Sequence, residues 1–175
     1  MTHHIALPGS LAPELLVPSL HGTQIDLATE KPDNFTAVFF YRGVHCPMCK
    51  TQLEELNRRV GEFSSRGISV LAVSMDSEER VKKQADQWSV GNLKVGYGLS
   101  EADARAWGLF ISRKEKDAEP ERFAEPGIAI IYPDGHIYAL FQQSVPFARP
   151  RLEDLLKGLD FVIEKQYPAR GTLAA

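Results

Sequence analysis

The sequence predicts an α/β fold, in which a central mixed β-sheet is flanked by helices on both faces and preceded by an N-terminal β-hairpin extension. Two observations predict it. Apolar runs of strand length alternate with helical periodicity in the first half of the chain, and two further strands and a long amphipathic helix close the second half. At 175 residues and 43% apolar composition, the whole chain, residues 1–175, is expected to form one domain with a full core.

The first half is expected to contain a hairpin followed by a strand-helix-strand-helix order. Prolines punctuate residues 1–20, with a short edge strand at 14–17 and a second at 24–27. Residues 35–41 form an apolar, aromatic run that predicts a strand buried on both faces. Helical spacing then extends to about residue 66, and the next strand covers 68–75. Ser77 is expected to cap the helix that follows.

The second half is expected to add three strands and two helices. A short strand is predicted at 93–97, a helix at 100–107 and a β-hairpin at 127–141 around Pro133-Asp134-Gly135. Residues 111–124 are charged and lack periodicity, which indicates a surface loop. Leucines at helical spacing from Leu152 onward predict a closing helix.

Both cysteines of the chain, Cys46 and Cys49, lie where the first buried strand gives way to the first long helix. A thiol at a helix N-terminus lies near unpaired backbone N–H groups and the positive end of the helix dipole, so its thiolate is favoured. A reactive dithiol is therefore the leading hypothesis. Two alternatives stay open: a pair of ordinary buried cysteines, and half of a zinc site completed by histidines that show no ligand spacing, namely His3, His4, His21, His45 and His136.

Composition narrows the classes of partner. The net charge is -3 with basic and acidic residues interspersed, which argues against a nucleic-acid surface and against a basic membrane patch. The first ten residues lack the basic and apolar regions of a secretory signal, so we expect a cytoplasmic location. Thiols are mostly reduced there, which favours a catalytic or redox-sensing cysteine pair over a structural disulfide.

With Cys-x-x-Cys at the first strand-to-helix junction, the chain resembles the thioredoxin-fold redoxins, specifically the alkyl hydroperoxide reductase/thiol-specific antioxidant (peroxiredoxin-like) family. The resemblance extends from Ala12-Pro13-Glu14 through the Ser74-Met75-Asp76-Ser77 turn to Pro133-Asp134-Gly135. It implies a thioredoxin-like fold and an antioxidant oxidoreductase without cofactor or metal.

Two templates within this resemblance give the cysteines different roles. Peroxiredoxins show Tyr-Pro-x3-Thr-x2-Cys, a Glu or Gln three residues later, and an Arg facing the site. Counting from Tyr41 places Arg42 on the Pro, Cys46 on the Thr, Cys49 on the peroxidatic cysteine and Gln52 on the Glu or Gln. A thiol is a poorer hydrogen-bond donor than the Thr that it replaces.

Thioredoxin-like oxidoreductases instead imply that Cys46 is the exposed attacking thiol and Cys49 the buried resolving thiol. Pro126 falls where their cis-proline is expected, at the position of the peroxiredoxin Arg. Because a proline cannot stabilise a thiolate, this template is favoured. His45 is expected to stabilise the thiolate as an imidazolium or to move protons. Four other arginines are available as a replacement cation, although each is expected on the surface: Arg42, Arg122, Arg149 and Arg151.

The leading prediction is thus a thiol-disulfide oxidoreductase that cycles the Cys46/Cys49 pair, with Arg42 and Pro47 next to the substrate. The alternatives are a thiol peroxidase with Cys49 peroxidatic and Cys46 resolving, and a non-enzymatic redox-sensing module. The resemblance implies a disulfide or hydroperoxide substrate and a thioredoxin- or glutaredoxin-type electron donor, with a homodimer among the assemblies to expect. The link at 142–150 is interpreted as a plain connector.

Overall fold

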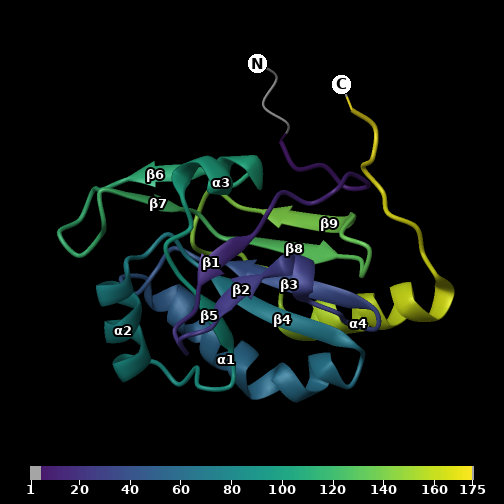
Figure 1. The fold of residues 1–175 in the computed structure, drawn as a ribbon, viewed down its shortest axis with the longest axis horizontal. Helices are drawn as coiled ribbons and strands as arrows, with labels where there is room; N and C mark the ends of the chain where they lie inside the picture. Colours follow the sequence, from purple (N-terminus) through teal and green to yellow (C-terminus); the bar gives the residue numbers. More distant parts are fainter. Residues whose placement is uncertain (1–4, 175) are drawn as a thin grey trace.

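The computed structural model describes residues 5–174, which form a five-stranded mixed sheet with two small hairpins and four α-helices. The sheet has the order β5-β4-β3-β8-β9, which can be followed in Figure 1. Its strands are β3 (Phe35–Phe40), β4 (Ile68–Val73), β5 (Lys94–Gly96), β8 (Gly127–Ile131) and β9 (Ile137–Gln142). The predicted fold class is confirmed.

Strand direction determines which loops meet. β3, β4 and β5 are parallel, whereas β8 is antiparallel to β3 and β9 is antiparallel to β8. β9 therefore runs in the same direction as β3 and β4. The segments that follow these three strands, and the segment that precedes β8, all lie at one edge of the sheet.

Alternating side chains of β3 enter two different cores. Phe35, Ala37 and Phe39 pack against α1 (Pro47–Ser64), α2 (Glu78–Gln87) and α4 (Leu152–Lys165). Val38 and Phe40 enter the other core, which holds α3 (Glu101–Ala106) and the hairpin β1 (Leu16–Pro18) and β2 (Gln24–Asp26). All six residues of β3 are buried, as expected for a central strand covered on both faces.

The prediction that residues 111–124 form a surface loop is wrong. Residues 111–124 contain the hairpin β6 (Ile111–Arg113) and β7 (Arg122–Ala124), paired through Ser112 and Phe123. Both strands are only three residues long, too short to show a sequence periodicity. The hairpin contributes to a core nevertheless, because Phe123 and Ala124 are buried.

Within residues 5–174, no helix has the length and apolar composition needed to cross a bilayer.

Candidate active site

The active-site turn, residues 42–46, connects the carboxyl end of β3 to α1. Cys46 is the N-cap of α1, and Pro47 takes the first helical position, where its missing N–H leaves no hydrogen bond unmade. The Cys46 N–H donates to the Gly43 carbonyl oxygen over 3.1 Å, which closes the turn. The predicted position of the cysteine pair at a helix N-terminus is confirmed.

The two thiols occupy one turn of α1 but have different surroundings. The Cys49 N–H donates to Cys46 Sγ over 3.3 Å, so a sulfur takes the capping role that Ser or Asp oxygens usually fill. Both cysteines are reduced and both are buried, Cys46 with 1% of its surface exposed and Cys49 with none. The prediction that Cys46 is exposed is therefore wrong, and Arg149 from the segment after β9 lies 3.8 Å from its sulfur.

The pKa values of the two thiols shift in opposite directions. The hydrogen bond with the Cys49 side chain is the largest cause that lowers the pKa of Cys46, to about 5, with the Cys49 N–H, Arg149 and Arg42 adding to it. Burial raises the pKa of Cys49, and the adjacent Cys46 sulfur adds to that effect. The surroundings of the pair thus favour the thiolate on Cys46 and the protonated thiol on Cys49.

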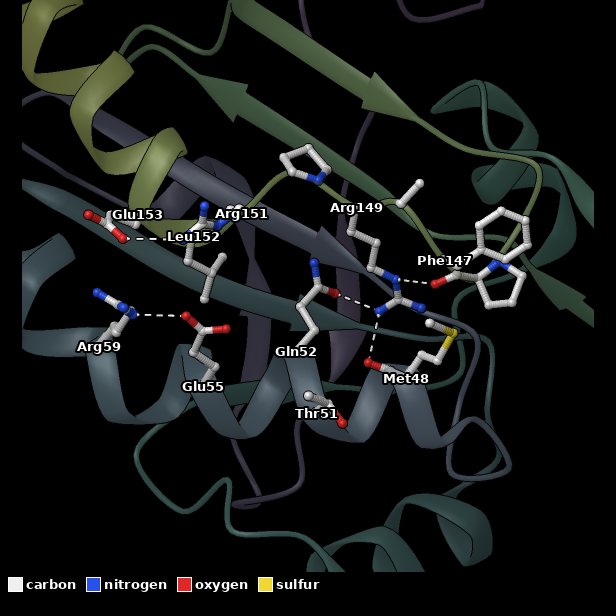
Figure 2. A pocket seen from close by; sticks show the side chains of 13 residues that line it. Met48, Thr51, Gln52, Glu55, Arg59, Phe147, Arg149, Arg151, Leu152 and Glu153 are labelled. Atoms are coloured by element: carbon white, nitrogen blue, oxygen red, sulfur yellow. Dashed lines mark hydrogen bonds and ion pairs between the residues drawn. The ribbon is translucent and has the colours of Figure 1, made fainter.

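Arg149 supplies a cation to both sulfurs. Its Nη2 donates to Cys49 Sγ over 3.0 Å and lies 3.8 Å from Cys46 Sγ. Nη1 donates to Gln52 Oε1 over 2.8 Å, and Nε donates to the Pro146 carbonyl oxygen over 2.8 Å, so the guanidinium is held on three sides. Figure 2 shows Arg149 reaching from the segment after β9 across to α1.

An unusual backbone conformation precedes Arg149. Ala148 adopts a left-handed φ of 59°, which is rare for residues other than glycine and costs energy. The Gln143 side-chain amide donates to the Phe147 and Ala148 carbonyl oxygens and holds this turn. The prediction that residues 142–150 are a plain connector is wrong, because they carry the arginine that contacts the dithiol.

A cavity of about 300 Å³ opens beside Arg149, between α1 and residues 146–153 (Figure 2). Its end nearest the thiols is formed by Met48 and Phe147, whose side chains are exposed, and its far end by the ion pairs Glu55–Arg59 and Arg151–Glu153. A small molecule in this cavity would contact Arg149 directly.

Arg42 does not line this cavity. Its guanidinium lies 3.1 Å from Glu125 Oε2 and 3.9 Å from Glu119 Oε1, and it stacks 4.7 Å above the Phe123 ring. These contacts join the active-site turn to the β6–β7 hairpin. The predicted role of Arg42 and Pro47 in substrate binding stays a prediction, with Pro47 exposed at the start of α1.

His45 is half-buried and turned toward the same hairpin. Its ring packs against Phe123 at 4.8 Å between centroids, and its Nδ1 lies 3.4 Å from Arg80 Nη2. Burial lowers the pKa of His45, the nearby Asp76 carboxylate opposes this effect, and the Arg42 and Arg80 cations add to it. This direction disfavours the imidazolium, and the predicted role of His45, as an imidazolium or in proton transfer, stays a prediction.

Pro126 is buried at the start of β8, opposite the end of β3. Residues 5–174 contain no cis peptide bond, so the predicted cis-proline is wrong. The chain enters β8 in extended form here, and the Pro126 carbonyl oxygen accepts the Gln143 N–H over 3.1 Å. Trans is the ordinary state of an X–Pro bond, and this entry into a strand does not require the alternative.

No group of three or more His, Cys, Asp or Glu side chains suited to a metal ion occurs in the described part of the chain. His3 and His4, two of the candidate zinc ligands, lie outside those residues.

Comparison with known proteins places the chain in a family. A model of the AhpC/TSA family matches residues 8–140, which is most of the chain and includes both cysteines. The chain belongs to the AhpC/TSA family. The family assignment made from the sequence is thereby confirmed.

Relatives in this family are peroxiredoxins. The chain is 27% identical over 139 residues to the 1-Cys peroxiredoxin B of Oryza sativa, covering 76% of this chain and 62% of the relative. It is 29% identical over 79 residues to the peroxiredoxin Bcp of Escherichia coli, covering 45% of this chain and 50% of that protein. The chain therefore spans about six-tenths or less of the length of these curated relatives.

Solved structures of peroxiredoxins and of an AhpC share the fold. A peroxiredoxin 6 of Arenicola marina aligns with a TM-score of 0.76 at 17% identity, over 93% of this chain and 75% of that one. An AhpC of Mycobacterium tuberculosis aligns with a TM-score of 0.74 at 18% identity, over 97% and 99% of the two chains. Both support the thioredoxin-like fold.

Proposed function

We propose that this protein is a thiol peroxidase that reduces a hydroperoxide with the Cys46/Cys49 pair. The observation that carries the proposal is the contact of Arg149 with both sulfurs. A peroxidatic thiolate needs a cation that stabilises it and that also stabilises the negative charge developing on the departing oxygen. Arg149 provides this cation from the segment after β9.

The chemistry follows from the two protonation states. The Cys46 thiolate attacks one peroxide oxygen, an S–O bond forms and the O–O bond breaks. The other oxygen leaves as an alkoxide or hydroxide beside Arg149 and takes a proton from water. Cys49 then attacks the Cys46 sulfenic acid, forming the disulfide and releasing water. An external dithiol returns two electrons and two protons by thiol–disulfide exchange.

Cys46 is the attacking thiol in this proposal because it carries the lower pKa. Arg149 lies nearer to Cys49, but burial keeps that thiol protonated and therefore a poor nucleophile until its partner is oxidised. This assignment keeps the cysteine roles predicted from the thioredoxin-like template, while the oxidant changes from a disulfide to a peroxide.

Disulfide exchange is the second candidate. The low pKa of Cys46 and a resolving thiol in the same helical turn suit attack on a disulfide equally well. The reactive sulfur is buried, however, with Arg149 3.8 Å away, which favours a small oxidant over a protein disulfide.

Replacing Arg149 tests the proposal. We expect Arg149→Met to lower the second-order rate constant for hydroperoxide consumption about 100-fold, because one preorganised donor to the departing oxygen is lost. Stopped-flow measurement with one hydroperoxide and excess dithiol gives this rate. The matched control is Arg58→Met, which removes an exposed arginine from α1 and should leave the rate unchanged.

Two results would count against the peroxidase. An Arg149→Met rate equal to that of the parent protein would show that the cation has no part in O–O cleavage. Turnover of insulin-type disulfides without any consumption of hydroperoxide would favour the exchange enzyme instead.

A further inference from the structure

Asp76 is a fully buried carboxylate on the loop between β4 and α2. Its Oδ1 accepts from Arg80 Nε over 2.9 Å, and its Oδ2 accepts the backbone N–H of Val44 over 2.8 Å. Each oxygen therefore has its own donor, and one of those donors belongs to the active-site turn.

The turn lies directly against this carboxylate. Gly43 has a φ of 135°, and a Cβ at that position would lie 2.5 Å from Asp76 Oδ2. The Gly43 carbonyl oxygen in turn accepts the Cys46 N–H. A short chain of contacts thus leads from the Asp76 carboxylate through the backbone of residues 43–44 to the reactive cysteine.

Arg80 extends the contacts to the β6–β7 hairpin. Its Nη2 donates to the Ala118 carbonyl oxygen over 3.0 Å and lies 3.4 Å from His45 Nδ1. The planar guanidinium therefore links Asp76, the residue before Cys46 and the hairpin loop at the same time. A lysine has a single ammonium group and lacks this fork.

We propose that Asp76 and Arg80 are positioning residues, which fix the 42–46 turn so that Cys46 Sγ meets the Cys49 N–H and Arg149. This inference rests on the proposed function in one respect, that Cys46 is the reactive thiolate. Neither residue touches the substrate, so their effect on chemistry passes through the position of Cys46.

Asp76→Asn separates position from charge. An amide has a single oxygen for two donors, the Val44 N–H and Arg80 Nε. Its NH₂ group then faces one of these donors, so the turn should loosen. Loosening weakens the hydrogen bonds to Cys46 Sγ and raises the pKa of that thiol. Loss of the Asp76 charge, in contrast, would lower the pKa of a nearby thiol through Coulomb interaction alone. The two explanations predict shifts of opposite sign.

Arg80→Lys is the second variant, and it keeps the charge unchanged. It retains a cation for Asp76 but loses the simultaneous contacts with Ala118 and His45. Lys82→Arg is the matched control on the same helix, since Lys82 pairs with Glu78 at the same spacing but is exposed.

The experiment measures the rate of iodoacetamide alkylation of Cys46 against pH, in a Cys49→Ser background. The midpoint of this pH profile gives the pKa of Cys46. We expect it to rise by about one pH unit in Asp76→Asn and by about half a unit in Arg80→Lys, and to stay unchanged in Lys82→Arg. If Asp76→Asn does not fold, Arg80→Lys carries the test.

A pH midpoint that stays constant or falls in these two variants would overturn the inference. A lower melting temperature would not rescue it, since a purely structural role lowers stability without moving the midpoint. Alkylation requires no peroxide. The alkylation result can therefore be interpreted even if the peroxidase proposal fails, and failure of this inference would not contradict the peroxidase proposal.

Discussion

Cys46 and Cys49 lie three residues apart, yet the backbone gives them opposite chemical properties. Both are buried, but Cys46 precedes the first turn of α1 and its sulfur accepts a backbone N–H, whereas Cys49 lies inside the turn and donates that N–H. A thiolate at an N-cap completes a hydrogen bond that the helix needs, so ionisation and helix capping favour each other.

The pKa of Cys46 predicts a specific pH profile. With a pKa of about 5, the thiol is almost fully ionised at pH 7, so its alkylation rate should stay level from pH 8 to about pH 6 and fall below pH 5. Alkylation at each pH followed by peptide mapping measures Cys46 alone. An ordinary thiol with a pKa of about 8.5 would instead react about 16-fold faster at pH 8.5 than at pH 7, and that result would contradict a thiolate on Cys46 at pH 7.

Residue roles were only partly predictable from the sequence. The Cys-x-x-Cys spacing after a strand was sufficient to place Cys46 at a helix start. Arg149 was one of four candidate cations, and the choice among them depends on the left-handed Ala148, which alanine does not signal. The cis bond predicted before Pro126 was wrong because the isomer of an X–Pro bond depends on its surroundings in the fold.

The active-site turn is the element on which the site depends, and a glycine makes it possible. Gly43 combines a positive φ with a close approach to Asp76, so a side chain is excluded on both grounds. The turn is held against α2 and the β6–β7 hairpin by Asp76, Arg80 and Arg42.

Two glycine substitutions should have effects of opposite sign. Gly43→Ala should lower the free energy of unfolding by about 2 kcal/mol, because it strains the turn and crowds the Asp76 carboxylate. Gly61→Ala, in the interior of α1 with no atom near the new Cβ, should raise it by about 0.5–1 kcal/mol. Urea titration monitored by tryptophan fluorescence measures both, and a stable Gly43→Ala protein with unchanged Cys46 reactivity would contradict the role of the turn.

Most elements follow from periodicity, whereas the β6–β7 hairpin does not. Helices α1, α2 and α4 each carry an apolar face that the sequence displays. The hairpin is charged, and its buried Glu119 and Glu125 are tolerated because Arg42 lies between them. Such compensation by a residue about eighty positions away has no local signature.

At the scale of the whole molecule, strand direction brings the site together. Cys46 follows β3, Asp76 follows β4 and Arg149 follows β9, and these three strands run in the same direction. The β6–β7 hairpin enters the same edge because it precedes the antiparallel β8. The sheet thus assembles four segments, separated by up to a hundred residues, around one pair of thiols.

The most direct measurement of the central claim is the intact mass of Cys46→Ser and Cys49→Ser after one equivalent of hydroperoxide. We expect Cys49→Ser to gain one oxygen atom, as a sulfenic acid on Cys46 that dimedone traps, while Cys46→Ser stays unmodified. The parent protein should lose two hydrogen atoms as the disulfide forms. Uptake of oxygen by Cys46→Ser alone, or by neither variant, would contradict attack on peroxide by Cys46.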